Sequence, residues 1–147
     1  MRIPMRVDYG VRALIELAQA SSTTPMRTAE IARNQGIPEA YLDQVLTILH
    51  KAGLIHSRRG PQGGHILAKD PSCIDLARIM GILEGRAPVL DCLTEPDGCS
   101  LSGACAQREV WVLFEESVQD LLSKTTIADM VLRQQELMAK DVHQIQR

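Results

Sequence analysis

Aromatic residues are scarce in this 147-residue sequence, which has two tyrosines, one tryptophan and one phenylalanine. A buried core must therefore be aliphatic, built from leucine, isoleucine, valine and methionine. No apolar run approaches the roughly 20 residues that span a bilayer. The opening MRIPMRVDYG also lacks the apolar stretch of a secretory signal. We therefore expect a cytoplasmic protein.

A strong positive charge is missing too, since the formal net charge is −2. This value argues against a nucleic-acid binder that relies on electrostatics alone. The charge is unevenly distributed, however: residues 1–70 carry a net +3 and residues 71–147 a net −5. This pattern suits a basic front half that faces phosphates and an acidic back half that handles association or sensing.

Motifs of common enzymes are absent. The sequence has no flavin or nucleotide-binding motif and no recognisable catalytic pair, so we do not expect an enzyme. A redox protein or electron carrier is the alternative of a different class.

Helical periodicity is present at the start of the chain. Val7, Val11, Leu14 and Ala18 recur at i, i+4, i+7 and i+11, which predicts an amphipathic helix over about 6–20. The core and the partners of such a helix must come from the segments that follow.

Two further short helices are predicted around a tight turn. Thr28 can N-cap a helix that runs to Asn34, and Gly36 suits its C-terminal end. Pro38 suits the first turn of the next helix, which ends near residue 52. This arrangement is typical of a helix-turn-helix.

A β-hairpin is predicted directly after these helices. Strand-like runs at 54–58 and 64–68 flank RGPQGG, which cannot be helical. A hairpin in this place is a wing, so we expect a mainly α fold. Residues 1–70 form a winged-helix DNA-binding domain in this prediction.

The third helix of a winged helix enters the major groove. Apolar residues at 42, 45, 46 and 49 mark its inward face. Gln44 can pair with adenine and Lys51 with phosphate, while Tyr41 either contacts DNA or packs on the protein surface. We expect the following residues to face DNA: Thr28, Ala40, Tyr41, Gln44, Lys51, Arg58 and Arg59.

The second half predicts a linking helix over 71–90, begun by Ser72 and Asp75 in a near capping box. A turn-rich loop over 91–106 follows. Residues 107–135 read as a long helix and cap, and its apolar stripe needs either a second copy of the chain or the earlier helices. A polar, loose tail is expected over 136–147.

Three of the four cysteines, Cys92, Cys99 and Cys105, lie in the loop with spacing Cys-x6-Cys-x5-Cys. A disulfide would leave one of them unpaired and needs an oxidising compartment. Zinc prefers closer pairs, whereas a loop of this kind can wrap an iron–sulfur cluster. Zinc and a clusterless thiol sensor stay open as alternatives. Cys73 lies apart from these three, and we expect it to be a small apolar filler.

The segments RVDYGVRALIELA, the wing SRRGPQGG, IMGILEG and the cysteine loop leading into REVW resemble the IscR/NsrR/RirA (Rrf-type) family of bacterial winged-helix regulators. The resemblance covers about residues 1–135. It implies a homodimer that binds DNA, with contacts from Tyr41, Gln44 and Arg59, and an iron–sulfur cluster on the three loop cysteines. It therefore implies a cytoplasmic transcription regulator.

The fourth cluster ligand is implied by the resemblance alone. In one branch it is a histidine at the position that Arg108 occupies here. In the NsrR branch it is an aspartate in the first helix of the other subunit, and Asp8 matches that position. This implies a 4Fe–4S cluster, with 2Fe–2S as the alternative. Glu109 and Asp91 are other candidate oxygen ligands.

The regulator expected from these observations is a repressor that binds a pseudo-palindromic operator. Its signal would be nitric oxide, iron or redox status, read through the loop cysteines.

Overall fold

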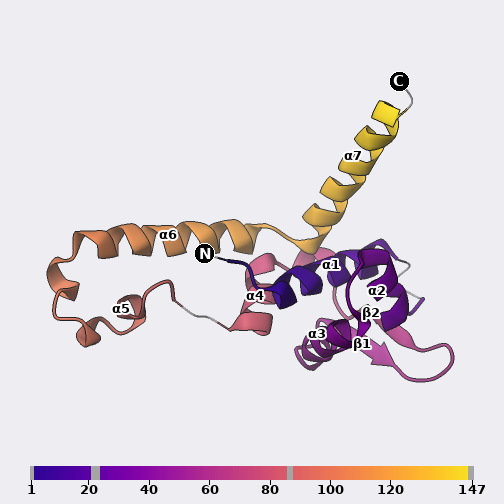
Figure 1. The fold of residues 1–147 in the computed structure, drawn as a ribbon, viewed down its shortest axis with the longest axis horizontal. Coiled ribbons are helices and arrows are strands. Elements are labelled where there is room, and N and C mark those ends of the chain that lie inside the picture. Colours follow the sequence, from indigo (N-terminus) through magenta and orange to yellow (C-terminus); the bar gives the residue numbers. More distant parts are fainter. Residues whose placement is uncertain (1, 21–23, 86–87, 146–147) are drawn as a thin grey trace.

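The computed structural model describes residues 2–20, 24–85 and 88–145, with side chains described up to residue 141. Helices and strands run in this order: α1 Met5–Gln19, α2 Thr28–Gln35, α3 Glu39–Lys51, β1 Ile55–Arg58, β2 Gly64–Leu67, η1 Pro71–Cys73, α4 Leu76–Glu84, α5 Asp91–Thr94, η2 Pro96–Gly98, η3 Ser102–Ala104, α6 Ala106–Lys124 and α7 Ile127–Ile145. The elements α1 to α4 and the hairpin form one body, from which α6 extends with α5 at its far end (Figure 1). The mainly α winged fold is thus confirmed.

The core is aliphatic, as the scarcity of aromatic residues predicts. Its fully buried side chains come from α1, α2, α3, β1, α4, α7 and the residues just before β1 and α4: Leu14, Ile31, Leu42, Val45, Leu46, Leu49, Leu54, Ile55, Ile74, Ile79 and Ile127. Burial of each such side chain contributes about 1.5–3 kcal/mol to stability. Because α7 contributes Ile127, the C-terminal half is fastened to the winged body and not merely tethered to it.

The helix-turn-helix forms where the sequence predicts it. Gly36 ends α2 in the left-handed conformation, with φ of 61°. Glu16 of α1 accepts hydrogen bonds from Asn34 at 2.7 Å and Gln35 at 2.6 Å, which holds α2 against α1. The prediction that Thr28 caps α2 is wrong, because Arg27 is the N-cap and no side chain caps the helix.

The wing is a two-stranded antiparallel hairpin, with register from Ile55 opposite Leu67 to Arg58 opposite Gly64. Gly64 has φ of 153°, and a Cβ there would lie 2.6 Å from the Met26 carbonyl oxygen. Only glycine therefore allows the segment before α2 to lie against β2.

The linking helix begins later than predicted. Asp75 is the N-cap of α4 and accepts a hydrogen bond from the Arg78 amide at 2.8 Å. Ser72 lies in η1, where Asp70 caps the turn. Asp75 is the cap because it directly precedes the first turn of α4, so its carboxylate reaches the amide of that turn.

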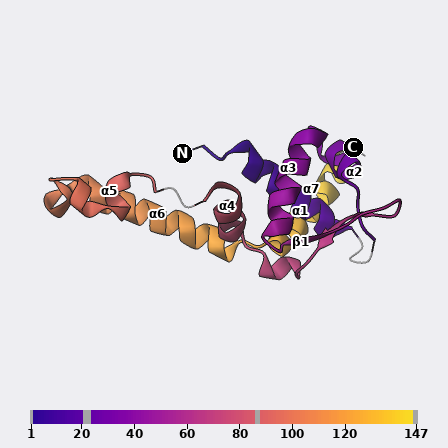
Figure 2. The same cartoon turned by 90° about the horizontal axis from the view of Figure 1, so that it is seen from below.

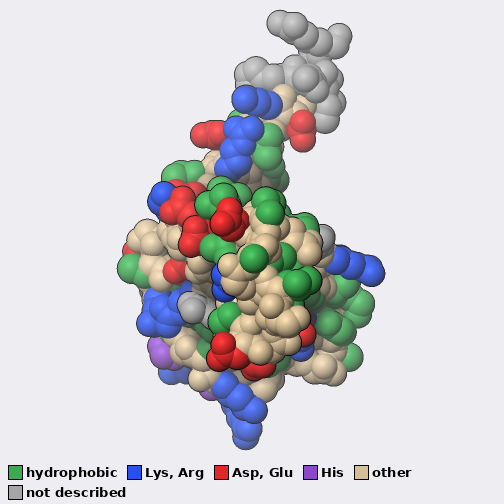
Figure 3. All heavy atoms as spheres, turned by 90° about the vertical axis from the view of Figure 1, so that its left-hand side faces the viewer, with side chains coloured by type: hydrophobic (Ala, Val, Ile, Leu, Met, Phe, Trp, Pro, Cys, Tyr) green, Lys and Arg blue, Asp and Glu red, His purple; other side chains and the backbone are tan. Residues whose placement is uncertain are grey.

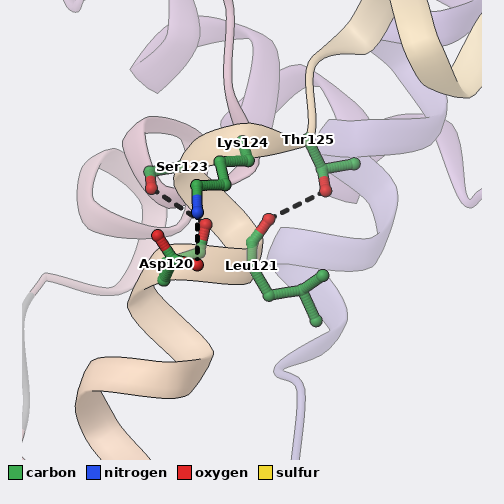
Figure 4. Close-up of polar contacts among 5 residues, drawn as sticks. All are labelled: Asp120, Leu121, Ser123, Lys124 and Thr125. Carbon is green, nitrogen blue, oxygen red and sulfur yellow. Dashed lines mark hydrogen bonds and ion pairs between the residues drawn. The ribbon is translucent and has the colours of Figure 1, made fainter.

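The chain turns sharply between α6 and α7. At the end of α6, Lys124 pairs with Asp120 at 2.7 Å, and the Thr125 hydroxyl donates to the Leu121 carbonyl at 2.8 Å (Figure 4). Thr126 and Asp129 then cap α7. The loose tail predicted from residue 136 is wrong as far as residue 145, because α7 runs to Ile145; residues 146–147 lie outside the described part.

Among the described residues, no helix combines the length and the apolar character needed to cross a membrane.

Candidate nucleic-acid interface and thiol site

One face of α3 is open to solvent. Leu42, Val45, Leu46 and Leu49 point into the core. The opposite face exposes the positions predicted to read DNA: Ala40, Tyr41, Gln44 and Lys51. Lys and Arg side chains project at the end of the molecule opposite α7, which is the end where α3 and the hairpin lie (Figures 1 and 3). This end of the fold can face a polyanion.

Tyr41 combines both roles that its sequence position allows. Its ring packs edge-on against Tyr9 of α1, with centroids 5.4 Å apart, yet the residue stays 39% exposed. The Arg12 guanidinium lies 5.9 Å from the Tyr9 ring centroid. Helix α1 therefore orients a tyrosine that remains free to contact a ligand.

The wing presents two unpaired cations. Arg58 and Arg59 are exposed, and neither side chain makes a hydrogen bond or ion pair with the described part of the chain. A Cβ at Gly63 would collide with the Arg58 carbonyl, so the tight turn needs glycine. Two arginine side chains without a partner at a tight turn are suited to phosphate or minor-groove contact.

His65 is a residue whose role the sequence did not reveal. Its Nδ1 lies 2.8 Å from the Ser57 hydroxyl and its Nε2 lies 3.0 Å from the Thr28 hydroxyl. Burial lowers the pKa of His65, although Asp43 opposes this shift. The cross-strand pairing of Ser57 with His65 was available only from the register of the hairpin.

The cysteine loop is more ordered than predicted. Cys92 lies in α5, Cys99 follows η2, and Cys105 is the N-cap residue of α6. All three are free thiols of intermediate exposure. Arg108 donates from Nε to the Cys92 carbonyl at 3.3 Å, which joins the first turn of α6 to α5.

The residue types of this loop suit an iron–sulfur cluster, but the described part of one chain alone does not bring three ligands together. Three thiols are the donors that iron–sulfur clusters use. The buried hydroxyl of Ser102, between Cys99 and Cys105, has no hydrogen-bond partner. Within the described residues, however, no three His, Cys, Asp or Glu side chains form a group that could hold a metal ion. The loop must therefore close further to bind one.

The candidate oxygen ligands lie in different places. Asp8 is in the first turn of α1, exposed and 3.5 Å from Arg12. Figures 1 and 2 show α5 at the far end of α6 from α1, so a single chain does not bring Asp8 to the cysteines. Asp91 and Glu109 are closer in the chain to the loop, and both are exposed. The prediction that Cys73 is a buried filler is wrong, because η1 leaves it exposed.

Helix α6 has an apolar face that the chain does not cover. Val110, Leu113 and Leu121 are 60%, 62% and 65% exposed. Another side of the same helix packs against α4, and its Trp111 and Phe114 rings meet edge-on. Packing on the earlier helices thus accounts for only part of the stripe.

Known proteins are similar to this chain in sequence and fold. Residues 3–133 match the model of the Rrf2 family, described as iron-dependent transcriptional regulator. The transcriptional regulator CymR of Bacillus subtilis is 32% identical over 130 residues, which cover 88% of this chain and 89% of CymR. The regulator IscR of Yersinia pseudotuberculosis is 31% identical over 141 residues, covering 96% and 85%.

Solved structures agree with these matches. The structure of CymR, the global cysteine regulator of B. subtilis, superposes with a TM-score of 0.78 at 30% identity and covers 90% of this chain and 98% of that one. The structure of T. potens IscR gives a TM-score of 0.73 at 34% identity, with 93% and 90% covered. The family match spans most of the chain, and these relatives are transcriptional regulators and not enzymes. This chain therefore belongs to the Rrf2 family of transcriptional regulators.

Proposed function

We propose that this chain acts in the cytoplasm as a homodimeric repressor that binds a pseudo-palindromic operator. Each subunit inserts α3 into a major groove, with Ala40, Tyr41 and Gln44 toward the base edges. Lys51, Thr28 and the wing arginines contact the backbone and the minor groove. The open face of α3 beside two unpaired arginines supports this assignment.

The second copy of the chain covers α6. Its exposed stripe of Val110, Leu113 and Leu121 occupies one side of a helix that extends away from the body. An isologous dimer pairs this stripe with itself. The spacing of the two α3 helices is then fixed by α6, so a change at the far end of α6 can alter DNA binding.

The loop thiols set the affinity for DNA, and the group that they hold is an iron–sulfur cluster, either 4Fe–4S or 2Fe–2S. One observation carries this proposal: three free, half-buried thiols lie on a folded loop at the start of α6. Cys92, Cys99 and Cys105 are the thiolate ligands. Asp8 from the second copy is the fourth, since in its own chain the helix α1 that carries it lies away from α5 and the far end of α6 (Figure 1).

When bound, the cluster would supply a centre that reacts with nitric oxide or oxygen and that can lose iron. The protein groups provide the rest of the response. Cys105 begins α6, and Arg108 holds α5 against its first turn. Asp8 lies in the first turn of α1, and Tyr9 of the same helix packs against Tyr41. A ligand set shared by α6 of one copy and α1 of the other thus joins the dimer interface to the DNA-reading helix.

Anaerobic purification tests the proposal. We expect a coloured protein with iron and sulfide on the wild-type chain and on Cys73→Ala, whose thiol is exposed and outside the loop. Ala variants of Cys92, Cys99 and Cys105 should each lose colour and iron. Equal colour in all of these proteins would show that the loop thiols are not the ligands.

A thiol sensor without a cluster is the second candidate. The lack of a three-ligand group among the described residues favours it. In that case the anaerobic protein is colourless, and the DNA affinity follows the oxidation state of the thiols. A colourless protein that carries stoichiometric zinc would instead indicate a zinc site.

A further inference from the structure

His65 lies where three segments of the DNA-binding face meet. It stands in β2, opposite Ser57 of β1. Its backbone amide donates to the Met26 carbonyl at 2.8 Å, and the Met26 amide donates to the His65 carbonyl at 3.0 Å. The segment before α2 therefore pairs with the wing like a short third strand.

The side chain of His65 joins the same segments a second time. Its two ring nitrogens are each taken by a hydroxyl, that of Ser57 on β1 and that of Thr28 at the start of α2. A hairpin of two four-residue strands is barely stable alone and does not fix its own angle to a helix. Contacts of this kind must fix that angle.

Neighbouring groups reinforce the joint. Arg27 donates a hydrogen bond to the Pro61 carbonyl at the wing turn. The bare backbone of Gly64 lets Met26 approach β2. These contacts hold the turn that carries Arg58 and Arg59, while both arginine side chains stay unpaired within the described residues. These contacts therefore orient the turn and leave the two arginine side chains available for a ligand.

We propose that His65 is a positioning residue for DNA binding: it locks the wing to the N-terminus of α2 so that Arg58, Arg59 and the Thr28 hydroxyl meet one stretch of DNA backbone together. This inference rests on the proposed function, in which the wing and α2 contact DNA. His65 acts through the groups it holds and does not touch the bases.

The protonation state of His65 decides which hydrogen bonds the Ser57 and Thr28 hydroxyls can donate. In a neutral imidazole one ring nitrogen donates and the other accepts. Either Ser57 or Thr28 must therefore donate its hydroxyl proton to the ring nitrogen that accepts. In the doubly protonated ring both nitrogens donate, and both hydroxyl protons are free to reach phosphate. Protonation of His65 thus strengthens binding to DNA.

The surroundings of His65 set the direction of this effect. Burial and His50 of α3 lower the pKa of His65, and Asp43 of α3 raises it. The ring is therefore neutral in the free protein near pH 7. Approaching phosphates favour the charged ring. DNA binding is then coupled to proton uptake, and affinity rises as pH falls toward the pKa of His65.

The test uses the anaerobically purified full-length dimer and a fluorescent duplex that the wild-type protein selects from a random library. Two variants, His65→Ala and His65→Gln, are compared with His56→Ala, a matched control because His56 is exposed on β1 and alternates to the other face of the hairpin. We expect His65→Ala to bind about tenfold more weakly. His65→Gln, which keeps one donor and one acceptor, should recover most of that loss.

The pH profile separates positioning from general destabilisation. Between pH 8 and pH 6 the wild type and His56→Ala should gain affinity, while His65→Gln should gain less. Binding of His65→Ala within twofold of the wild type would overturn the inference, and so would identical pH profiles for the wild type and His65→Gln.

Folding is checked by thermal unfolding. If His65→Ala fails to fold, Ser57→Ala decides, because Ser57 is exposed and its loss removes one half of the joint. Unchanged affinity in Ser57→Ala would then reject the proposal. A wild-type protein that selects no duplex at all refutes the proposed function itself, which is a different result.

Discussion

Replacing Arg59 by alanine is the sharpest probe of the wing. The side chain is exposed and makes no hydrogen bond or ion pair with the described residues. Its removal should therefore change the free energy of unfolding by less than about 0.5 kcal/mol. Any effect on DNA binding then comes from the missing contact and not from a weakened fold.

The expected magnitude follows from counterion release. Each phosphate contact contributes about 0.9 to the slope of log affinity against log salt concentration. When salt rises from 50 to 200 mM, the loss of affinity should be about 3.5-fold smaller for the variant, which has one phosphate contact fewer, than for the wild type. If Arg59 enters the minor groove, a preference for narrow A·T-rich flanks should also weaken.

Fluorescence anisotropy titrations over a series of salt concentrations measure this slope. Lys140→Ala is the control, because it removes the same charge from an exposed position on α7, which projects away from the hairpin. The control should keep the wild-type slope. An Arg59→Ala slope equal to that of the wild type, with equal affinity, would remove the wing from the proposed interface.

Three further outcomes are expected. Leu113→Glu should convert the dimer to monomers in sedimentation experiments, because it places a charge in the exposed stripe of α6, whereas Glu116→Gln on the same helix should stay dimeric. Ile127→Ala should lower the free energy of unfolding by about 2–4 kcal/mol in denaturant titrations, since the side chain is fully buried where α7 meets the core; a loss under about 0.5 kcal/mol would contradict the packing. Asp8→Ala should keep the three thiols but lose iron faster under chelation than Glu30→Ala, an exposed carboxylate on α2; equal rates would exclude Asp8 as a ligand.

Local patterns in the sequence carried the prediction of the winged body. The inward face of α3 follows from the spacing of Leu42 and Leu49, and the left-handed end of α2 follows from Gly36. Such signals depend on residues within one or two turns of each other, so they can be read without the fold.

Features that depend on distant or competing contacts were not predictable. The joint at His65 needs the register of the hairpin and a threonine 37 residues away. The residue that caps α4 depends on where the packed helix begins, and in the fold it begins after Asp75 and not after Ser72. The segment ELMAK at 136–140 has no glycine or proline and consists of good helix formers, which continue α7 through it.

The thiol loop was predictable in position but not in shape. Spacing identified Cys92, Cys99 and Cys105, whereas the short helices between them and the bond from Arg108 to the Cys92 carbonyl arise from packing on α6. Asp8 came from resemblance alone, since in one chain the helix α1 that carries it lies away from α5 of the loop (Figure 1).

Control of DNA binding by the loop thiols can be tested by measuring operator affinity anaerobically, before and after exposure to nitric oxide. We expect the wild type and Cys73→Ala to lose affinity by about tenfold or more, within the usual range of allosteric coupling, and Cys105→Ala to be unaffected by the treatment. An unchanged wild-type affinity, or the same loss in Cys105→Ala, would contradict control of DNA binding by the loop thiols.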